Sequence, residues 1–497
     1  MSLQPSKGPA QDDQGAQDAA STNAHAEAAR RTFERMTSAP VAGLVIRLGI
    51  PTMISMLITA LYNTASTWYV SFLGTSAVGA KGVVFALQMI IQDPMASLDP
   101  RKKVEDIMFG QGCASQASRL LGARNYARAN TLASSALAAV LIAGSVFGLL
   151  VWILMDPLLS LMGATPTILP YAQDYARAVL VAAPLMAASF TLNNILRSEG
   201  LALFGMVGLA CGGILNVAVA PVFIFVLDRG IAGAGWATML CQSVALFILL
   251  SFFLRGKGTI ALSTASISRS WEVYSSILKN GIPSLTRNIL GAVAASVLNL
   301  MAGNFGDAGV AGMSIVGRVM MITSAALSGS GQGYQPVRGY IWGAGRYERG
   351  SKAFDTTMLL STSAMTLLAI VGFVFAEEVI AFFKTNDPQV MAVAVLALKL
   401  QCLVMPIIPV NIMGNMTYQV LGRTVVATLL ASTRQGLFFL PSILILPTLF
   451  GLTGLQSAQP VAELCSAVIC GFFAVRFRHE VREKIRHKAQ SSDAADA

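Results

Sequence analysis

The stretch Gly110–Gly112, which reads Gly-Gln-Gly, recurs at Gly331–Gly333, and the offset between the two copies is 221 residues. Further pairs at equivalent places are Gly49–Pro51 with Gly281–Pro283, Gly122 with Gly343, Pro184 with Pro406, Gly200 with Gly422, and Gly230 with Gly451. Two copies of one apolar unit in a membrane protein typically enclose a central binding site, because the interface between the copies can rock. The repeat therefore predicts transport ahead of any catalytic activity.

The composition is that of an integral membrane protein. Hydrophobic residues make up 54% of the chain, charged residues make up 12%, and the mean hydropathy is +0.63. These values exclude an ordinary soluble chain. Apolar stretches of about 20 residues, the length that crosses a bilayer, recur six times in each copy. We therefore predict an all-α polytopic membrane protein with twelve transmembrane helices in two six-helix lobes. The predicted spans are 43–72, 76–121, 129–155, 166–191, 202–227, 231–254, 274–304, 308–340, 352–379, 388–414, 420–448 and 453–475.

The regions outside the spans define the predicted domain plan. Residues 1–40 are rich in Gln, Ala, Ser and Asp and lack a long apolar run, so a disordered cytoplasmic tail is expected there. This segment also has no apolar signal-peptide region followed by a cleavage site. The N-lobe is predicted at 41–256, an inter-lobe cytoplasmic linker at 257–273, the C-lobe at 274–476 and a basic cytoplasmic tail at 477–497.

Lys and Arg residues predict the orientation, because cytoplasmic loops of membrane proteins carry an excess of them. Their clusters, such as Arg119–Arg128 and Arg346–Lys352, fall between even and odd spans, whereas the opposite loops hold little beyond Arg229 and Lys384. Both termini are therefore expected to be cytoplasmic, in a monomer that crosses the lipid bilayer of the inner (plasma) membrane. The net charge of +10 reports this topology, so no nucleic-acid partner is expected.

Copy one carries a surplus segment in its second span. The step from Gly74 to Gly110 is 36 residues, but the equivalent step in copy two is 25. The surplus is the charged segment 94–106, which includes the three cations Arg101–Lys103 and two prolines. Placing adjacent cations near mid-bilayer has a large free-energy cost, and prolines break helices. Either the segment loops out into an aqueous cavity or to one membrane face, or it does not belong in the working protein.

The chain offers no catalytic or metal-binding constellation. Its three histidines lie in the tails, and its six cysteines fall within apolar spans without a pairing pattern. We therefore expect neither an enzyme nor a bound metal or cofactor. The Gly-Gln-Gly stretches lack the strand-turn-helix context and the Lys of a phosphate loop, so close packing of small helix residues is the better explanation for them.

An ordered set of motifs runs through both copies. The motifs are Gly49–Pro51, Tyr62–Asn63, Gly110–Ala123, Arg197–Gly200, Asn216–Pro221, Gly331–Tyr340, Arg434–Gly436 and Gln459–Glu463. Together they resemble the multidrug and toxic-compound extrusion (MATE) family over about residues 40–476, and the second-copy motifs are most similar to its bacterial branch of DinF-like and staphylococcal-type drug exporters. The resemblance implies two six-helix lobes related by a pseudo-two-fold axis along the membrane normal, with a cavity between them. It also implies export of amphipathic, often cationic compounds driven by inward Na⁺ or H⁺.

The chain departs from the family pattern at two N-lobe positions. The family places one aspartate in span one, in a Tyr-Asn-x-x-Asp pattern, and another in span five, in Asn-x-x-x-Asp-Pro, and these are the carboxylates credited with cation coupling. Here the two positions are Ser66 and Ala220. The N-lobe coupling mechanism of the family therefore cannot be carried over to this chain.

A carboxylate within the membrane is the usual acceptor for a coupling ion, and Glu463 lies near the middle of span twelve. The cations placed within spans, Arg287, Arg318, Lys399 and Arg434, all belong to copy two. Two roles for Glu463 stay open. It pairs with Arg434 or Arg287 and holds the C-lobe helices together, or it exchanges that partner for a proton or Na⁺ during the cycle. Four cations against one carboxylate also hint at an anionic substrate.

Uncharged polar side chains in the spans are further candidates. Amides and hydroxyls can bind Na⁺ or substrate, but they also act as interhelical hydrogen-bond glue worth about 0.6 kcal/mol each. Asn63 and Asn216 are the leading candidates because they lie in matched motifs, and Gln332 of the second Gly-Gln-Gly stretch joins them. The N-lobe set is Asn63, Ser66, Gln88, Gln92, Asn193, Asn194 and Asn216.

The leading interpretation is a secondary-active, cation-coupled antiporter that exports amphipathic drugs or other toxic small molecules by alternating access between two lobes. The first alternative is a flippase for lipid-linked precursors, or a polysaccharide exporter of the related superfamily. The second alternative is a degenerate, non-transporting membrane protein, which the two missing aspartates and the charged segment 94–106 favour.

Overall fold

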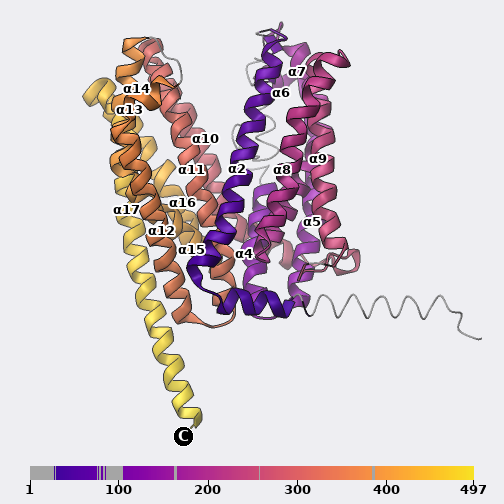
Figure 1. Ribbon diagram of the computed structural model, residues 1–497, viewed down its shortest axis with the longest axis vertical. Coiled ribbons are helices and arrows are strands. Elements are labelled where there is room, and N and C mark those ends of the chain that lie inside the picture. The colour runs from indigo at the N-terminus through magenta and orange to yellow at the C-terminus, as the bar shows by residue number, and fades with distance from the viewer. Residues whose placement is uncertain are drawn as a thin grey trace, which may run out of the picture.

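A computed structural model describes residues 27–496 apart from 28, 75, 78–79, 82–83, 85–104, 162–164, 257 and 383–386. The described residues form helices and no strands (Figure 1). This is the expected all-α class, because a chain in lipid must satisfy its backbone N–H and C=O groups internally. Most of the surplus segment 94–106 lies outside the described residues.

The first half of the chain forms the N-lobe. Its last helix is followed by a short 3₁₀ turn, η2 (Thr264–Ser266). The N-lobe helices are α2 (Val41–Ser71), α4 (Glu105–Gly122), α5 (Tyr126–Ile153), α6 (Met155–Leu161), α7 (Leu169–Ser198), α8 (Ala202–Pro221), the π-helical turn η1 (Val222–Val226) and α9 (Gly230–Leu254).

The second half forms the C-lobe. Its last helix, α17, joins two helices across Gly451, which adopts a positive φ of 57°. The C-lobe elements are α10 (Trp271–Gly303), α11 (Gly306–Gly343), α12 (Tyr347–Val374), α13 (Ala376–Ala381), α14 (Pro388–Val404), η3 (Met405–Ile407), α15 (Ile408–Val420), α16 (Thr424–Ser432), η4 (Thr433–Leu437) and α17 (Phe439–Asp496).

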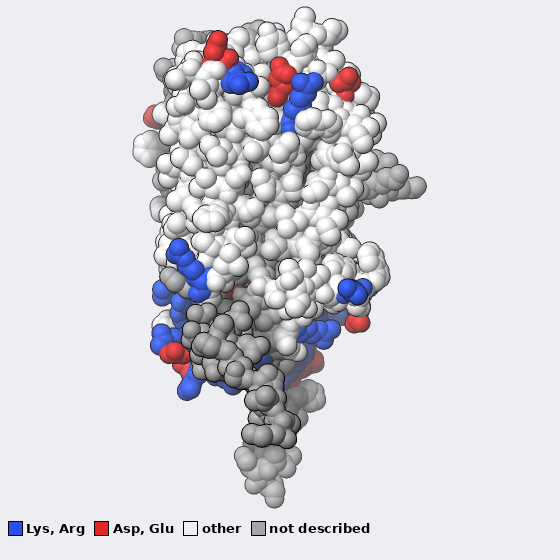
Figure 2. Space-filling view, turned by 90° about the vertical axis from the view of Figure 1, so that its right-hand side faces the viewer, with Lys and Arg blue, Asp and Glu red and all other residues white. Residues whose placement is uncertain are grey.

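The described residues contain ten helical segments that are long and apolar enough to cross a membrane. The last of them, Thr424–Arg486, holds two predicted spans on either side of Gly451, and the predicted span 76–121 is only partly described. On one face of the molecule, charged side chains gather at the two ends and leave a broad uncharged band between them (Figure 2). That distribution suits a protein surrounded by lipid.

The two lobes meet in a two-fold pattern. Helix α2 contacts α11, α4 contacts α10, and α4 also contacts α11. Because α2 and α10 start the two copies, and α4 and α11 carry the two Gly-Gln-Gly stretches, the first two contacts are equivalent. The third contact joins equivalent helices, as expected on a two-fold axis. The predicted two-lobe fold is therefore confirmed.

The repeated glycines occupy these lobe contacts. A Cβ atom on Gly112 would lie 2.9 Å from the amide nitrogen of Gly281, and one on Gly333 would lie 2.6 Å from the Cα of Gly49. Gly112 and Gly333 are equivalent, and so are Gly281 and Gly49, so each Gly-Gln-Gly stretch packs on the Gly-Ile-Pro stretch of the other copy. The prediction of close helix packing is confirmed, because no larger side chain fits between backbones at this distance.

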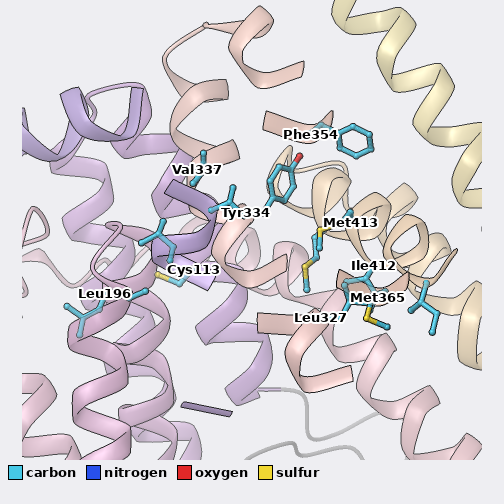
Figure 3. Packing of buried hydrophobic residues seen from close by; sticks show 14 of the residues in the cluster. Cys113, Leu196, Leu327, Tyr334, Val337, Phe354, Met365, Ile412 and Met413 are labelled. Carbon is cyan, nitrogen blue, oxygen red and sulfur yellow. The ribbon is translucent and has the colours of Figure 1, made fainter. Parts of the chain in front are cut away.

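The lobes join at one end and separate toward the other (Figure 1). Buried side chains of both lobes form one hydrophobic cluster, in which Cys113 and Leu196 of the N-lobe accompany Tyr334 and Val337 of the C-lobe (Figure 3). At the other end the N-lobe has a cluster of its own, with buried residues between Val70 and Ala237 and none from the C-lobe. The packing between the lobes is therefore concentrated at the joined end, which leaves room for cavities toward the other end.

A short helix over residues 29–38 lies across the joined end of the two lobes (Figure 1). Arg35 Nη2 donates to the carbonyl oxygen of Gly200 in the N-lobe at 3.2 Å, and Arg346 Nη1 of the C-lobe donates to the Thr37 carbonyl oxygen at 2.9 Å. The sequence predicts disorder for 1–40, but this last part is ordered by contacts with loops far along the chain. Residues 1–26 lie outside the described part.

The segment that connects the lobes is fastened to the N-lobe. The backbone N–H of Ala261 donates to Asn130 Oδ1 at 3.0 Å, and the N–H of Ser268 donates to Ser135 Oγ at 2.9 Å. Side-chain acceptors on α5 thus hold the backbone of the connecting segment up to the start of α10.

Candidate functional site

The first candidate site is a cavity inside the C-lobe with a volume of about 540 Å³. Residues of α10, α11, α14, η4 and α17 line it, so it is enclosed by helices of one lobe. Its apolar wall includes three methionines and a phenylalanine. Its polar lining residues are Asn288, Ser324, Gln401, Arg434, Gln435, Gln459 and Glu463.

Glu463 is completely buried at the side of this cavity, where its carboxylate accepts several hydrogen bonds. Arg434 Nε and Gln459 Nε2 both donate to its Oε1 atom, the second at 3.1 Å. Asn411 Nδ2 donates to its Oε2 atom at 2.8 Å. The sequence-based hypothesis that Glu463 pairs with Arg434 or Arg287 is confirmed for Arg434.

Local helix geometry explains why these groups meet. Gln459 and Glu463 are one turn apart on α17 and therefore face the same side. Arg434 lies in the π-helical turn η4, whose widened backbone changes the direction in which its side chain leaves the helix. Single π-helical turns inside transmembrane helices frequently occur at functional sites.

The C-lobe site has the groups that a cation exchange needs. The Glu463–Arg434 pair is electrically neutral, and the Arg434 side chain is 18% exposed against 1% for Glu463. Two nearby amide oxygens, Gln401 Oε1 and Asn411 Oδ1, are buried and have no hydrogen-bond partner among the described residues. A carboxylate with amide oxygens around it can hold a proton or a hard cation such as Na⁺.

The second candidate site is a cavity of about 300 Å³ on the N-lobe side of the lobe interface. It is lined by α2, α7, α8 and α9, and Asn288 and Gln332 of the C-lobe complete it. Asn288 lines both cavities. Among the described lining residues of this second cavity, Arg197 is the one charged side chain.

Arg197 lies in the last turn of α7 and is 5% exposed. Its Nη2 atom donates to Asn194 Oδ1, and its Nη1 atom donates to Gln332 Oε1 across the lobe interface. Both partners are neutral. Arg197 therefore brings a net positive charge to the N-lobe cavity.

The predicted site residues divide into those that line the two cavities and those that do not. Asn193 and Gln332 line the N-lobe cavity, and Arg434 and Glu463 line the C-lobe cavity. Gln88 and the side chain of Asn63 lie outside the described part of the chain.

The remaining predicted residues lie away from both cavities. Ser66 is buried in α2, and Asn216 Nδ2 donates to Thr238 Oγ1 at 3.3 Å within the N-lobe. Arg287 binds at the lobe interface, donating to Asn415 Oδ1 at 3.1 Å and to Gln111 Oε1 at 3.3 Å. Lys399 Nζ lies 5.9 Å from the centroid of a phenylalanine ring.

Sequence reasoning missed several residues of the two sites, above all Arg197, Asn411 and Asn288. The predicted span ends at residue 191 and so places Arg197 in a loop, whereas α7 continues to Ser198. Its neighbours Asn193 and Asn194 were a usable signal, because polar residues one turn before an arginine in an apolar span indicate a shared polar face.

Comparison with known proteins places both halves of the chain in one family. The family model MatE matches residues 51–222 and again residues 283–443. The multidrug export protein MepA of Staphylococcus saprophyticus is 24% identical over 445 residues, which cover 89% of this chain and 94% of that protein. MepA of Staphylococcus aureus strain MSSA476 is 23% identical over 453 residues, covering 90% and 95%.

A solved structure supports the same fold. An outward-facing conformation of a multidrug resistance MATE family transporter of the MOP superfamily superposes with a TM-score of 0.82, at 24% sequence identity. The match covers 91% of this chain and 98% of that one.

Proposed function

Because this chain belongs to the MatE family, we propose that it is a secondary-active antiporter that exports amphipathic organic compounds in exchange for H⁺ or Na⁺. It is a multipass membrane transporter and not an enzyme. Curated relatives that match about nine tenths of the chain are named for multidrug export, which supports a drug-like or otherwise toxic small molecule as the substrate.

The observation that carries the coupling proposal is the buried Glu463–Arg434 pair beside the C-lobe cavity. Ser66 and Ala220 replace the N-lobe aspartates, and among the described lining residues of the two cavities Glu463 is the carboxylate that can accept a coupling ion. A proton or Na⁺ on Glu463 neutralises the carboxylate and releases Arg434. The pair holds η4 against α17, so ion binding changes the packing of these two elements.

Alternating access between the lobes supplies the rest of the mechanism. The lobes meet through glycine contacts at one end, and each lobe keeps its own packed helices. Such rigid units can rock about their interface and expose the cavities to either side of the membrane in turn. Coupling requires that ion and substrate each change the affinity of the transporter for the other, and this effect is reciprocal.

We propose the orientation that the Lys and Arg distribution predicts, with both termini cytoplasmic and the joined end of the lobes facing the cytoplasm. The basic tail of α17 and the helix over 29–38 both lie at that end (Figure 1). Fusing a reporter that is fluorescent only in the cytoplasm to each terminus tests this: signal from both fusions is expected, and a dark fusion at either end contradicts it.

The coupling test uses the purified chain in proteoliposomes with an imposed H⁺ or Na⁺ gradient. The readouts are efflux of a fluorescent amphipathic dye and the countermovement of the ion. Glu463→Gln is expected to lower gradient-driven efflux at least tenfold, while gradient-free dye exchange continues. The matched control is Asp355→Asn, which removes an exposed carboxylate of the same lobe that pairs with Arg478 and is expected to leave coupling unchanged.

Two outcomes contradict the proposal. Undiminished gradient-driven efflux by Glu463→Gln removes this residue from coupling. Absence of any dye movement by the wild-type chain, at verified reconstitution, favours the non-transporting alternative.

A further inference from the structure

The N-lobe cavity has a polar stripe that the coupling mechanism does not use. Ser189, Asn193 and Arg197 are spaced four residues apart on α7 and all line the cavity. Residues at this spacing lie above one another on one helix face. The stripe therefore leads from the cavity interior down to the guanidinium at the lobe interface.

Within the described part of the chain, two side chains of the stripe lack a matching partner: the Ser189 hydroxyl lacks a hydrogen-bond partner, and the Arg197 guanidinium lacks a carboxylate. Ser189 is 1% exposed, and its Oγ atom has no hydrogen-bond partner among the described residues. Arg197 is buried, keeps its charge because a guanidinium does not lose its proton in proteins, and contacts two neutral amides. Buried charges are normally neutralised by an opposite charge, and among the described residues Arg197 has no carboxylate within ion-pair distance.

The other hydroxyls of the cavity do not share this feature. Thr52, Ser55 and Thr59 of α2 each donate to a backbone carbonyl oxygen one turn earlier in their own helix, at 2.9 Å in every case. The unpartnered hydroxyl of Ser189 and the charge of Arg197 therefore both lie on the α7 side of the cavity. The apolar side chains that line the cavity include Met56, Met186, Phe190 and Leu209.

We propose that this cavity binds the anionic group of the exported compound, with Arg197 and Ser189 as its donors and the methionine and phenylalanine side chains around its apolar body. The substrate class is an amphiphile that carries a carboxylate. A planar guanidinium matches a carboxylate in shape and charge. This inference rests on the proposed function, because it names the substrate class of the same transporter.

The geometry also connects substrate binding to lobe movement. The Nη1 atom that would meet the carboxylate donates to Gln332 of the C-lobe. A carboxylate is a stronger acceptor for a guanidinium than an amide is, so it displaces Gln332 and removes a contact between the lobes. Binding of the anion therefore weakens the contact between the lobes at their joined end.

The residue equivalent to Arg197 is uncharged, and the cation at the matching contact, Arg287, comes from α10. The repeat makes Gln419 equivalent to Arg197 and Gln111 equivalent to Gln332. Gln419 Nε2 donates to Ser284 Oγ at 2.6 Å, and Ser284 Oγ in turn donates to Gln111 Oε1 at 2.5 Å. A cation at this position of the repeat is therefore found in the N-lobe, where Arg197 lines the cavity, whereas Arg287 lines neither of the two cavities.

The test compares three dansyl amphiphiles with the same undecyl chain, ending in a carboxylate, a primary amide or an ammonium group. Binding to the full chain in neutral maltoside detergent is followed by dansyl fluorescence, with excess unlabelled acid as competitor. The wild-type chain is expected to bind the acid at least tenfold more tightly than the amide and the amine. Equal affinity for all three overturns the proposal without any variant.

Variants locate the site. Arg197→Gln is expected to abolish the preference for the acid, Arg197→Lys to keep part of it, and Ser189→Ala to weaken acid binding about threefold. The matched control is Arg177→Gln, an exposed arginine of the same helix, which is expected to change nothing. An unchanged acid preference in Arg197→Gln overturns the assignment. If Arg197→Gln does not fold, Arg197→Lys and Ser189→Ala decide, and wild-type affinity in both overturns the site.

The assay separates this inference from the proposed function because it uses no gradient. A preference for the acid together with failed gradient-driven efflux supports the anion site and contradicts the antiporter proposal. Gradient-driven efflux without a preference for the acid supports the antiporter proposal and contradicts the anion site.

Discussion

The two lobes share a backbone plan and differ in the charges that they bury. The N-lobe cavity holds Arg197 with two neutral amide partners, whereas the C-lobe cavity holds Glu463 with the guanidinium of Arg434. The repeat is preserved where backbones touch, at Gly112 and Gly333, because neither contact accepts a side chain. It has diverged where side chains face the cavities. A duplicated bundle thus keeps its packing while each half acquires its own chemistry.

The largest expected effect concerns the partner of the buried carboxylate. Arg434→Met leaves Glu463 buried without its cation, and breaking a buried pair from one side costs about 3–5 kcal/mol. We expect a large fall in the thermal unfolding temperature in detergent, and substantial recovery in the double variant Arg434→Met/Glu463→Gln.

The N-lobe supplies the comparison for that experiment. Arg197→Met removes a cation that has neutral partners, so no carboxylate is left behind and the loss of stability is expected to be smaller. An equal loss in Arg197→Met and Arg434→Met would mean that the N-lobe charge is as tightly paired as the C-lobe one, and the contrast between the lobes would fail.

The next effect tests the two-fold contacts. Gly112→Ala and Gly333→Ala each place a methyl group against the backbone of the other lobe, and overpacking of this kind costs about 1–3 kcal/mol. We expect similar losses in thermal stability from both. Gly291→Ala and Gly317→Ala are the controls, because a Cβ there meets no atom within 4 Å. Clearly different losses of thermal stability in the two interface variants would show that the two contacts are not equivalent.

The last test concerns a carboxyl group that the N-lobe buries just beyond α7. Glu199 Oε2 accepts the backbone N–H of Thr259 at 2.5 Å, and the equivalent residue of the C-lobe is Leu421. Burial raises the pKa of Glu199 to about 8 from an ordinary value of 4.5, although hydrogen bonds from the backbone of Thr259 and Ile260 oppose the shift.

The sign follows from linkage. The folded chain holds the Glu199 proton more tightly than the unfolded chain, so this contribution to stability is complete below pH 4.5 and is lost as the pH rises through about 8. Wild-type thermal stability is expected to fall more than that of Glu199→Gln between pH 5 and pH 9. Parallel pH profiles of the two proteins would show that burial of this carboxyl is not linked to stability.

The sequence predicts how the helices pack better than it predicts which charged side chains pair. Hydropathy and the offset of 221 residues were enough to predict the two-lobe helical fold and the close packing of the Gly-Gln-Gly stretches. Glu463 was identifiable as a coupling candidate from its place in an apolar span. The pattern did not decide between Arg434 and Arg287 as its partner, because both are arginines in spans of the same lobe.

By itself the sequence determined the helices and their duplication, since span length and helix periodicity are local properties that depend on neighbouring residues alone. Only the tertiary structure decided that Arg197 faces a cavity, that Arg287 lies at the lobe interface, and that residues 29–38 pack across the joined end. These outcomes depend on contacts between segments more than a hundred residues apart, such as Arg197 with Gln332. The geometry of such contacts is created when the lobes pack together.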